Sequence, residues 1–132
     1  MIDDTFAPLS AGMGIFRTSV SVASHADPAT RRVLHDVLVD TGAELNWIPR
    51  EILEDLGISP EGTESYETAD GRIIEREIGF ALLYVNGRAT GTTVVFAEPS
   101  DQALLGAIGL EGLNFRVDLR LKQLVPAGPR HV

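Results

Sequence analysis

The 132-residue sequence contains no cysteine. The chain therefore forms no disulfide bond, thiolate nucleophile or cysteine-ligated metal site, whatever its redox compartment. Basic residues are also scarce, because 11 Lys and Arg stand against 19 Asp and Glu, for a formal net charge of -8. Nucleic acids and anionic membranes are bound through clustered positive charge, so we expect no nucleic acid and no membrane as a partner.

Long hydrophobic runs are missing as well. No apolar stretch approaches the roughly 20 residues of a membrane-spanning helix, and the opening MIDDTFAPLS has two acids but neither a basic nor an apolar signal region. These features favour a cytoplasmic protein. With 44% hydrophobic and 23% charged residues, the composition is that of a folded chain, and the length suits one domain with a real core.

Metal and cofactor motifs are not found either. His25, His35 and His131 lie far apart without the spacing of metal ligands, so we expect no metal site. Glycine-rich phosphate loops and serine-nucleophile signatures are absent, and we expect no cofactor.

The pattern that is present has mainly a period of two, which is typical of β-strands. Residues 14–24 alternate polar and apolar side chains and predict a half-buried strand. Residues 24–32 are polar, contain Pro28 and predict a loop. Residues 33–40 are rich in β-branched and apolar residues and predict a second strand that runs directly into Asp40.

Residues 49–57 change to a helical pattern. Pro49 suits the first helical position, three apolar residues share one face, and Gly57 suits the C-terminal stop. Farther on, Asp70-Gly71 and Asn86-Gly87 each lie between strand-like arms and predict two hairpins with primed two-residue turns. Residues 101–114 predict a short strand followed by about one helical turn.

The last strand is predicted over residues 115–126, where Val117, Leu119 and Leu121 alternate with polar residues. Together these elements indicate a mainly β protein with one or two short helices. The simplest architecture for them is a small closed, barrel-like sheet.

The tripeptide Asp40-Thr41-Gly42 stands where the second strand ends. By itself it is explained by an Asx-type turn that closes the strand. Its context adds three features. The apolar strand would bury Asp40, a hairpin with its tip at Asp70-Gly71 follows to act as a cover, and Gly106 in Leu104-Leu105-Gly106 lets backbones pack closely beside the loop.

This order of motifs resembles the retropepsin-like aspartic proteases, specifically the single-domain bacterial members related to retroviral proteases. The resemblance covers residues 14–126, with an N-terminal extension at 1–13 and a C-terminal tail at 127–132. It implies an acid-protease fold with a flap hairpin. It also implies that Asp40 is the catalytic carboxylate, that the Thr41 hydroxyl ties two active-site loops together, and that the Gly42 amide approaches the carboxylates.

The resemblance also implies a set of substrate-binding residues from the active-site loop, the flap tip and the glycine element. These are Ala43, Glu44, Ala69, Asp70, Gly71, Arg72 and Leu105. The chain departs from the retroviral pattern at three places: Glu44 replaces a shorter acidic residue, Ala107 replaces an arginine that braces the dimer, and the flap tip is more polar.

Hydrolysis of this kind needs two carboxylates that share a proton, and the chain has one Asp-Thr-Gly. Asp36 and Asp118 lie in strand-like contexts without a following turn of small residues. A two-fold homodimer supplies the second Asp40. We therefore predict an aspartic endopeptidase that acts on a peptide or protein substrate. The alternatives are a non-catalytic dimerisation or peptide-binding module of the same fold, and a β-barrel that binds a small ligand.

Overall fold

The structure is a computed structural model that describes residues 16–132. The predicted N-terminal extension and the first two residues of the predicted first strand lie outside this range. Within it, no helix is long and apolar enough to cross a membrane.

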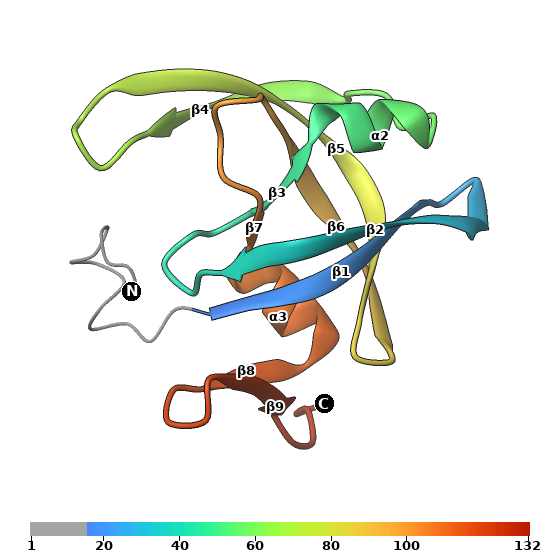
Figure 1. The fold of residues 1–132 in the computed structure, drawn as a ribbon, viewed down its shortest axis with the longest axis vertical. Coiled ribbons are helices and arrows are strands. Elements are labelled where there is room, and N and C mark those ends of the chain that lie inside the picture. The colour runs from blue at the N-terminus through green and yellow to red at the C-terminus, as the bar shows by residue number, and fades with distance from the viewer. Residues whose placement is uncertain (1–15) are drawn as a thin grey trace.

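The described chain forms short strands and two short helices, labelled as in Figure 1. In order they are β1 (Phe16–Ser24), β2 (Asp27–Val39), β3 (Asn46–Pro49), α2 (Arg50–Asp55), β4 (Gly62–Glu67), β5 (Ile73–Val85), β6 (Arg88–Ala97), β7 (Leu104–Leu105), α3 (Ala107–Leu113), β8 (Phe115–Asp118) and β9 (Gln123–Pro126).

Seven strands form one sheet in the order β1-β2-β7-β3-β6-β5-β4. β1, at one end of the sheet, also pairs with β5 through Ser21, Val22 and Ala23, which curls the sheet around the core and leaves β4 outside the closure. Figure 1 shows the resulting barrel-like body, with β4 and the first half of β5 extending from it as a hairpin. The predicted mainly β, barrel-like class is confirmed.

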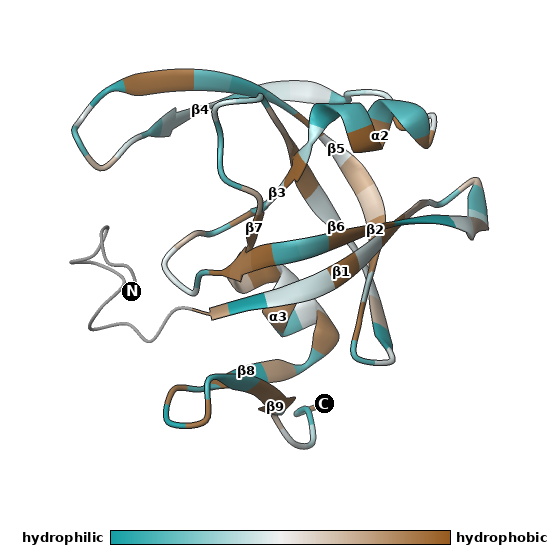
Figure 2. Cartoon of the chain, in the orientation of Figure 1, coloured by the Kyte–Doolittle hydropathy of each residue, from teal (hydrophilic) through white to brown (hydrophobic). Residues whose placement is uncertain are grey.

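The core lies inside this curved sheet and is capped by the helices. Its members are apolar side chains that alternate with outward polar ones along β1, β2, β5 and β6, as the brown and teal bands of Figure 2 show. The largest fully buried side chains include Phe96, Ile48, Leu53, Leu83 and Leu105. Burial of this apolar surface is the main force that holds the barrel together.

The loop predicted at residues 24–32 is wrong, because β2 already begins at Asp27 and only His25 and Ala26 form the turn. The β1–β2 register shifts between Ala23 and Ser24, so the residues around Pro28 fall in an irregular part of the ladder. A proline, which has no N–H to donate, is tolerated at such a place.

The single last strand predicted over residues 115–126 is also wrong, because β8 and β9 form a separate antiparallel hairpin. The carboxylate of Asp118 accepts hydrogen bonds from the backbone N–H groups of Arg120 and Leu121, both at 3.0 Å. This side-chain turn competes with the strand, and Lys122 completes it with φ of 54°.

The predicted helix is confirmed as α2, with Pro49 directly before it and Gly57, at φ of 75°, after its end. The Asn86-Gly87 turn is confirmed as well, since both residues have positive φ and Val85 pairs with Arg88. α3 is longer than the single turn that the sequence predicts.

Candidate active site

Asp40 follows the last residue of β2, at the point where the strand gives way to a turn. Its backbone N–H donates to the carbonyl of Leu105 in β7 at 3.0 Å. Its half-buried carboxylate accepts the N–H of Gly42 at 2.9 Å. A side chain at position 42 would place its Cβ 3.2 Å from the same oxygen, so glycine keeps this approach open.

The loop that follows Asp40 is joined to the start of α3 by backbone hydrogen bonds. The N–H of Ala107 donates to the carbonyl of Ala43 at 2.8 Å, and the N–H of Ile108 donates to that of Glu44 at 3.0 Å. These bonds use N–H groups that a helix start leaves without an internal partner. The active-site loop is therefore fixed by the main chain of the Leu104-Leu105-Gly106 element and its helix.

Gly106 makes this contact possible. A Cβ at Gly106 would lie 2.8 Å from the carbonyl oxygen of Ala43, and the carbonyl of Leu45 would be closer still. The close backbone packing predicted for Gly106 is confirmed.

Leu105 has a different role from the predicted one. Its side chain is only 1% exposed and belongs to the core cluster. A buried core side chain has no surface to offer a peptide, so Leu105 does not belong in the substrate-binding set. It supports the site through its carbonyl, which accepts the Asp40 N–H.

Asn46 is a site residue that the sequence analysis missed. Its side chain is fully buried, with exposure of 0%. Its Oδ1 accepts the N–H of Gly106 at 3.0 Å, while its Nδ2 donates to the carbonyl of Thr93 at 3.1 Å and to the hydroxyl of Thr92 at 3.3 Å. The available signal was one amide residue within the otherwise apolar run LNWI.

The flap hairpin is formed by β4 and β5, and its tip is held by its own side chains. Gly71 donates its N–H to the carbonyl of Thr68 at 2.9 Å, and Gly71 has φ of 88°. Asp70 does not share the positive φ, so the predicted primed two-residue turn is wrong. The geometry is a three-residue loop with glycine in the left-handed position, a common alternative for hairpins.

The carboxylate of Asp70 organises this tip although the residue is exposed. It accepts a hydrogen bond from the hydroxyl of Thr68 and another from the guanidinium of Arg72 at 3.0 Å. These bonds, the Thr68 hydroxyl first, lower the pKa of Asp70 to about 2. The Asp70 side chain therefore stays ionised in mildly acid solution, where it remains paired with Arg72.

The arms of the flap are anchored to the body at two places. The ring of Tyr66 in β4 meets the ring of Trp47 in β3 edge-on, with centroids 5.2 Å apart. The Tyr66 hydroxyl is buried and has no hydrogen-bond partner among the described residues. Burial, followed by the charges of Glu64 and Glu44, raises the pKa of Tyr66.

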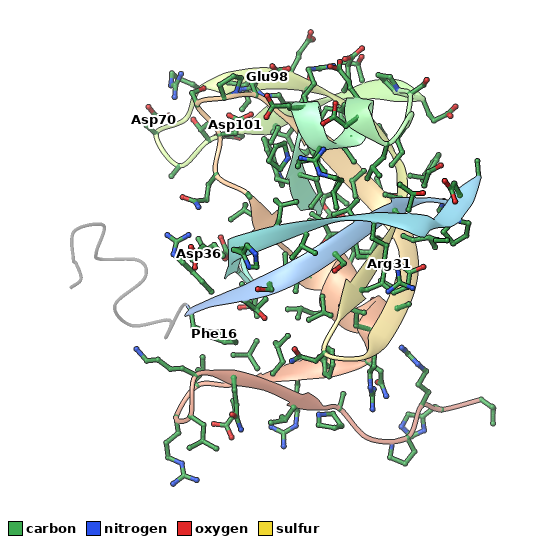
Figure 3. The ribbon with its side chains drawn as sticks, turned by 45° about the vertical axis from the view of Figure 1, so that its right-hand side comes forward. Phe16, Arg31, Asp36, Asp70, Glu98 and Asp101 are labelled. Carbon is green, nitrogen blue, oxygen red and sulfur yellow. The ribbon has the colours of Figure 1, made fainter. Side chains whose placement is uncertain are left out.

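The second anchor is ionic. Arg76 in β5 donates to both carboxylate oxygens of Asp101, at 2.7 and 2.9 Å, and this half-buried pair lowers the pKa of Asp101. Next to it, Arg50 donates to Glu77 at 2.7 Å and to Glu98 at 2.9 Å. Figure 3 shows Glu98 and Asp101 at the base of the hairpin and Asp70 out at its tip.

The predicted site residues thus fall into two groups. Asp40, Thr41, Gly42, Ala43 and Glu44 lie together on the loop after β2, and Ala69 to Arg72 lie together at the exposed flap tip. Figure 1 shows both segments projecting on the same side of the molecule.

The alternative carboxylates are placed differently. Asp36 is exposed in an irregular part of β2 with φ of 60° (Figure 3), and Asp118 is occupied by its own turn. In residues 16–132, no group of three or more His, Asp or Glu is arranged to hold a metal ion.

Comparison with solved structures finds two viral proteins with a limited likeness to this chain. The solution structure of the simian foamy virus (mac) protease has 22% sequence identity and a TM-score of 0.49, covering 72% of this chain and 91% of that chain. The foamy viral protease-reverse transcriptase in complex with an RNA/DNA hybrid has 19% identity and a TM-score of 0.48, covering 72% of this chain but 12% of that chain. No protein of curated function matches the chain.

The family comparison is decisive. Residues 30–108, more than half of the chain, match the family described as aspartyl protease. The matched segment contains Asp40-Thr41-Gly42, the flap and Leu104-Leu105-Gly106, in this order. The chain therefore belongs to the aspartyl protease family, and its fold is mainly β.

Proposed function

We propose that this chain is an aspartic endopeptidase that acts as a homodimer, in which Asp40 of each of two copies contributes to one catalytic dyad. The observation that carries the proposal is the Asp40 loop itself. It presents a half-buried carboxylate at a strand end and is held by backbone hydrogen bonds to the carbonyl of Leu105 and from the N–H groups of Ala107 and Ile108. The retropepsin-like domain is assigned to residues 14–126.

The chemistry requires two carboxylates within hydrogen-bonding distance that share one proton. The ionised member accepts a proton from water as the water attacks the peptide carbonyl carbon, and the protonated member donates a hydrogen bond to the carbonyl oxygen. Two carboxyl groups so close cannot both be ionised, because their negative charges repel, and one member therefore stays protonated. Asp40 supplies the carboxylate, and the Gly42 N–H orients it at 2.9 Å.

The second carboxylate is best supplied by another copy of the chain. Asp118 is committed to the β8–β9 turn, and Asp36 lies in the β2 irregularity outside the Asp-Thr-Gly turn. In a two-fold dimer the same surface of both copies meets at the axis, so an axis beside Asp40 pairs the two Asp40 loops directly.

The surface next to the Asp40 loop supports this assembly. A groove of about 520 Å³ runs from Thr41 along α3 and β8, with Leu110, Phe115 and Val117 among its lining residues. β8 continues into the turn that exposes Leu119 and Leu121, at 54% and 55%. An axis at Asp40 brings a second copy over this groove and covers apolar surface that water now contacts.

Substrate contacts are proposed for the remaining residues of the two groups. Ala43 and Glu44 lie on the loop beside the dyad, and the tip residues Ala69 to Arg72 lie on the hairpin that projects on the same side. A peptide bound between them in an extended form would be covered by the flap, which excludes water from the reacting bond.

The catalytic part of the proposal is tested by Asp40→Asn. The amide has nearly the same size and still accepts the Gly42 N–H, so the fold and thermal unfolding should stay unchanged. Peptide hydrolysis should fall by about 10³-fold or more, because the shared-proton chemistry is lost. Activity on an unstructured peptide and binding of a pepstatin-type inhibitor are measured together. Normal turnover in the purified variant would overturn the assignment, and peptide binding without hydrolysis in the wild type would favour the non-catalytic module.

The homodimer is tested by dilution. A monomer holds half a site, so specific activity per subunit should fall as the concentration drops through the dimer dissociation constant. Sedimentation velocity gives that constant independently. Specific activity that stays constant well below it would show that the site is not shared.

A further inference from the structure

Asn46 is the most deeply buried polar side chain of the described chain, and all of its hydrogen-bonding atoms are used. Its carbonyl oxygen takes the N–H of Gly106, and its amino group serves two oxygens of β6, those of Thr92 and Thr93. One side chain of β3 thus connects β7 with β6 at the level of the active-site loop.

The group that Asn46 holds and the group that holds Asp40 are the two ends of one peptide bond. The Leu105 carbonyl accepts the Asp40 N–H at 3.0 Å, and the Gly106 N–H donates to Asn46 at 3.0 Å. These two atoms belong to the same peptide unit, which is planar and rigid. Fixing its N–H therefore fixes the direction of the carbonyl that receives Asp40.

Packing alone does not explain this residue. A buried amide costs free energy unless every polar atom is satisfied, whereas an apolar side chain of similar volume would fill the same space without that cost. The neighbouring helix has adapted to it, since a Cβ at Gly109 would collide with Asn46 Oδ1 and lie 2.8 Å from Leu105 Cδ1.

We propose that Asn46 is a positioning residue for the catalytic carboxylate: it orients the Leu105–Gly106 peptide and so fixes the backbone of Asp40. The role deepens the proposed function and rests on it for its catalytic consequence. The backbone consequence is independent of catalysis.

The first experiment compares Asn46→Ala with the matched control Thr92→Val. The control removes one partner of the Asn46 amino group but leaves the Gly106 bond intact. In Asn46→Ala, kcat should fall at least about tenfold with KM within about twofold, because a slightly misplaced carboxylate still allows peptide binding. Thr92→Val should keep kcat within about threefold, even if both variants lose similar thermal stability.

The second readout needs no substrate. Amide exchange of Asp40 and Gly106, followed by NMR in the native state, should speed up by about tenfold or more in Asn46→Ala and stay near wild type in Thr92→Val. Amides of the β5–β6 ladder serve as an internal reference for global unfolding.

The third variant, Asn46→Asp, uses pH as a reversible switch. A carboxyl group buried at this position has a raised pKa, and its protonated form accepts the Gly106 N–H and donates to the Thr93 carbonyl as the amide does. Activity should therefore approach wild type at acid pH and fall, as pH rises, earlier than in wild type. A profile parallel to wild type at every pH would overturn the role of these hydrogen bonds.

The outcomes separate this inference from the proposed function. Wild-type kcat and unchanged Asp40 amide exchange in Asn46→Ala would overturn the positioning role. The catalytic dyad would still be supported if Asp40→Asn were inactive. Equal losses of kcat in Asn46→Ala and Thr92→Val would also overturn it, because they would reflect stability alone. Full activity in Asp40→Asn would overturn the proposed function, and accelerated exchange in Asn46→Ala would still support the backbone role.

Discussion

The two halves of the candidate site are held by opposite means. The Asp40 loop is fixed by main-chain hydrogen bonds, by the buried side-chain amide of Asn46, and by close packing against Gly106, where there is no room for a Cβ. The flap tip is fixed only by contacts within itself, among its exposed side chains and its own backbone, and a Cβ at Gly71 would meet no described atom within 4 Å. Under the proposed function, the chemistry that needs one geometry would lie on the rigid side, and substrate would enter on the side that can move.

The flap itself repeats this contrast on a smaller scale. Its arms are tied to the body by the Trp47–Tyr66 contact and by the pair between Arg76 and Asp101. Among residues 16–132, the tip beyond residues 67 and 73 has no such tie. The part free to close over a peptide is therefore the short loop between these anchors, rather than the whole hairpin.

The strongest test of the contrast compares one substitution at two glycines. Gly106→Ala should destabilise the protein by about 3 kcal/mol and abolish activity, because the new Cβ overlaps carbonyl oxygens of the active-site loop. Gly71→Ala should cost only about 1 kcal/mol, which is the strain of positive φ. Urea unfolding measures both, and equal costs would mean that the two regions are packed alike.

The anchor at the flap base gives a smaller effect with a pH signature. Asp101→Asn should cost about 2 kcal/mol at neutral pH, because it removes a two-point ion pair that is only 11–16% exposed. Arg76 lowers the folded-state pKa of Asp101 below its ordinary 3.8. The stabilisation is therefore present above that ordinary value and lost as pH falls through the lower, folded-state value.

The free energy of unfolding, measured for wild type and Asp101→Asn at a series of pH values, checks the direction of this pH dependence. The difference between the two proteins should shrink below about pH 4. A difference that grows toward acid pH would show that the ion pair is not its source.

The smallest effect is expected at the flap tip and concerns catalysis more than stability. Gly71→Val places a β-branched residue at φ of 88°, so the tip must change its turn. We expect kcat/KM to fall about tenfold with little change in global unfolding. Amide exchange over residues 66–76 should also slow when an inhibitor binds the wild-type protein. Normal kcat/KM together with unchanged exchange would identify the hairpin as ordinary surface.

Much of this fold could be predicted because the signals are local. Asn86-Gly87 specifies its turn through two residues that accept positive φ, and the helix after Pro49 carries both of its boundary signals. Asp40-Thr41-Gly42 and Leu104-Leu105-Gly106 were found from sequence because their order along the chain is that of a known family. Their contact, across more than sixty residues, follows from that order.

The rest depended on contacts that periodicity does not reveal. Asp118 converts an alternating strand pattern into a turn, because its carboxylate captures two backbone N–H groups. Leu105 was predicted to contact substrate, and the sequence does not show that its side chain is buried by its neighbours in the fold. Asn46 is meaningful only through partners about fifty and sixty residues away, and no local pattern marks them.

The contact between Trp47 and Tyr66 gives the molecule a built-in optical reporter. Trp47 is the single tryptophan of the sequence, so its emission comes from one place, just after the Asp40 loop. The ring against it belongs to the flap strand and carries a buried hydroxyl. Any displacement of β4 from β3 changes the polarity around that indole and shifts its fluorescence, so a movement of the whole flap arm can be told apart from one confined to the tip in the unlabelled protein, with Tyr66→Phe to identify the signal.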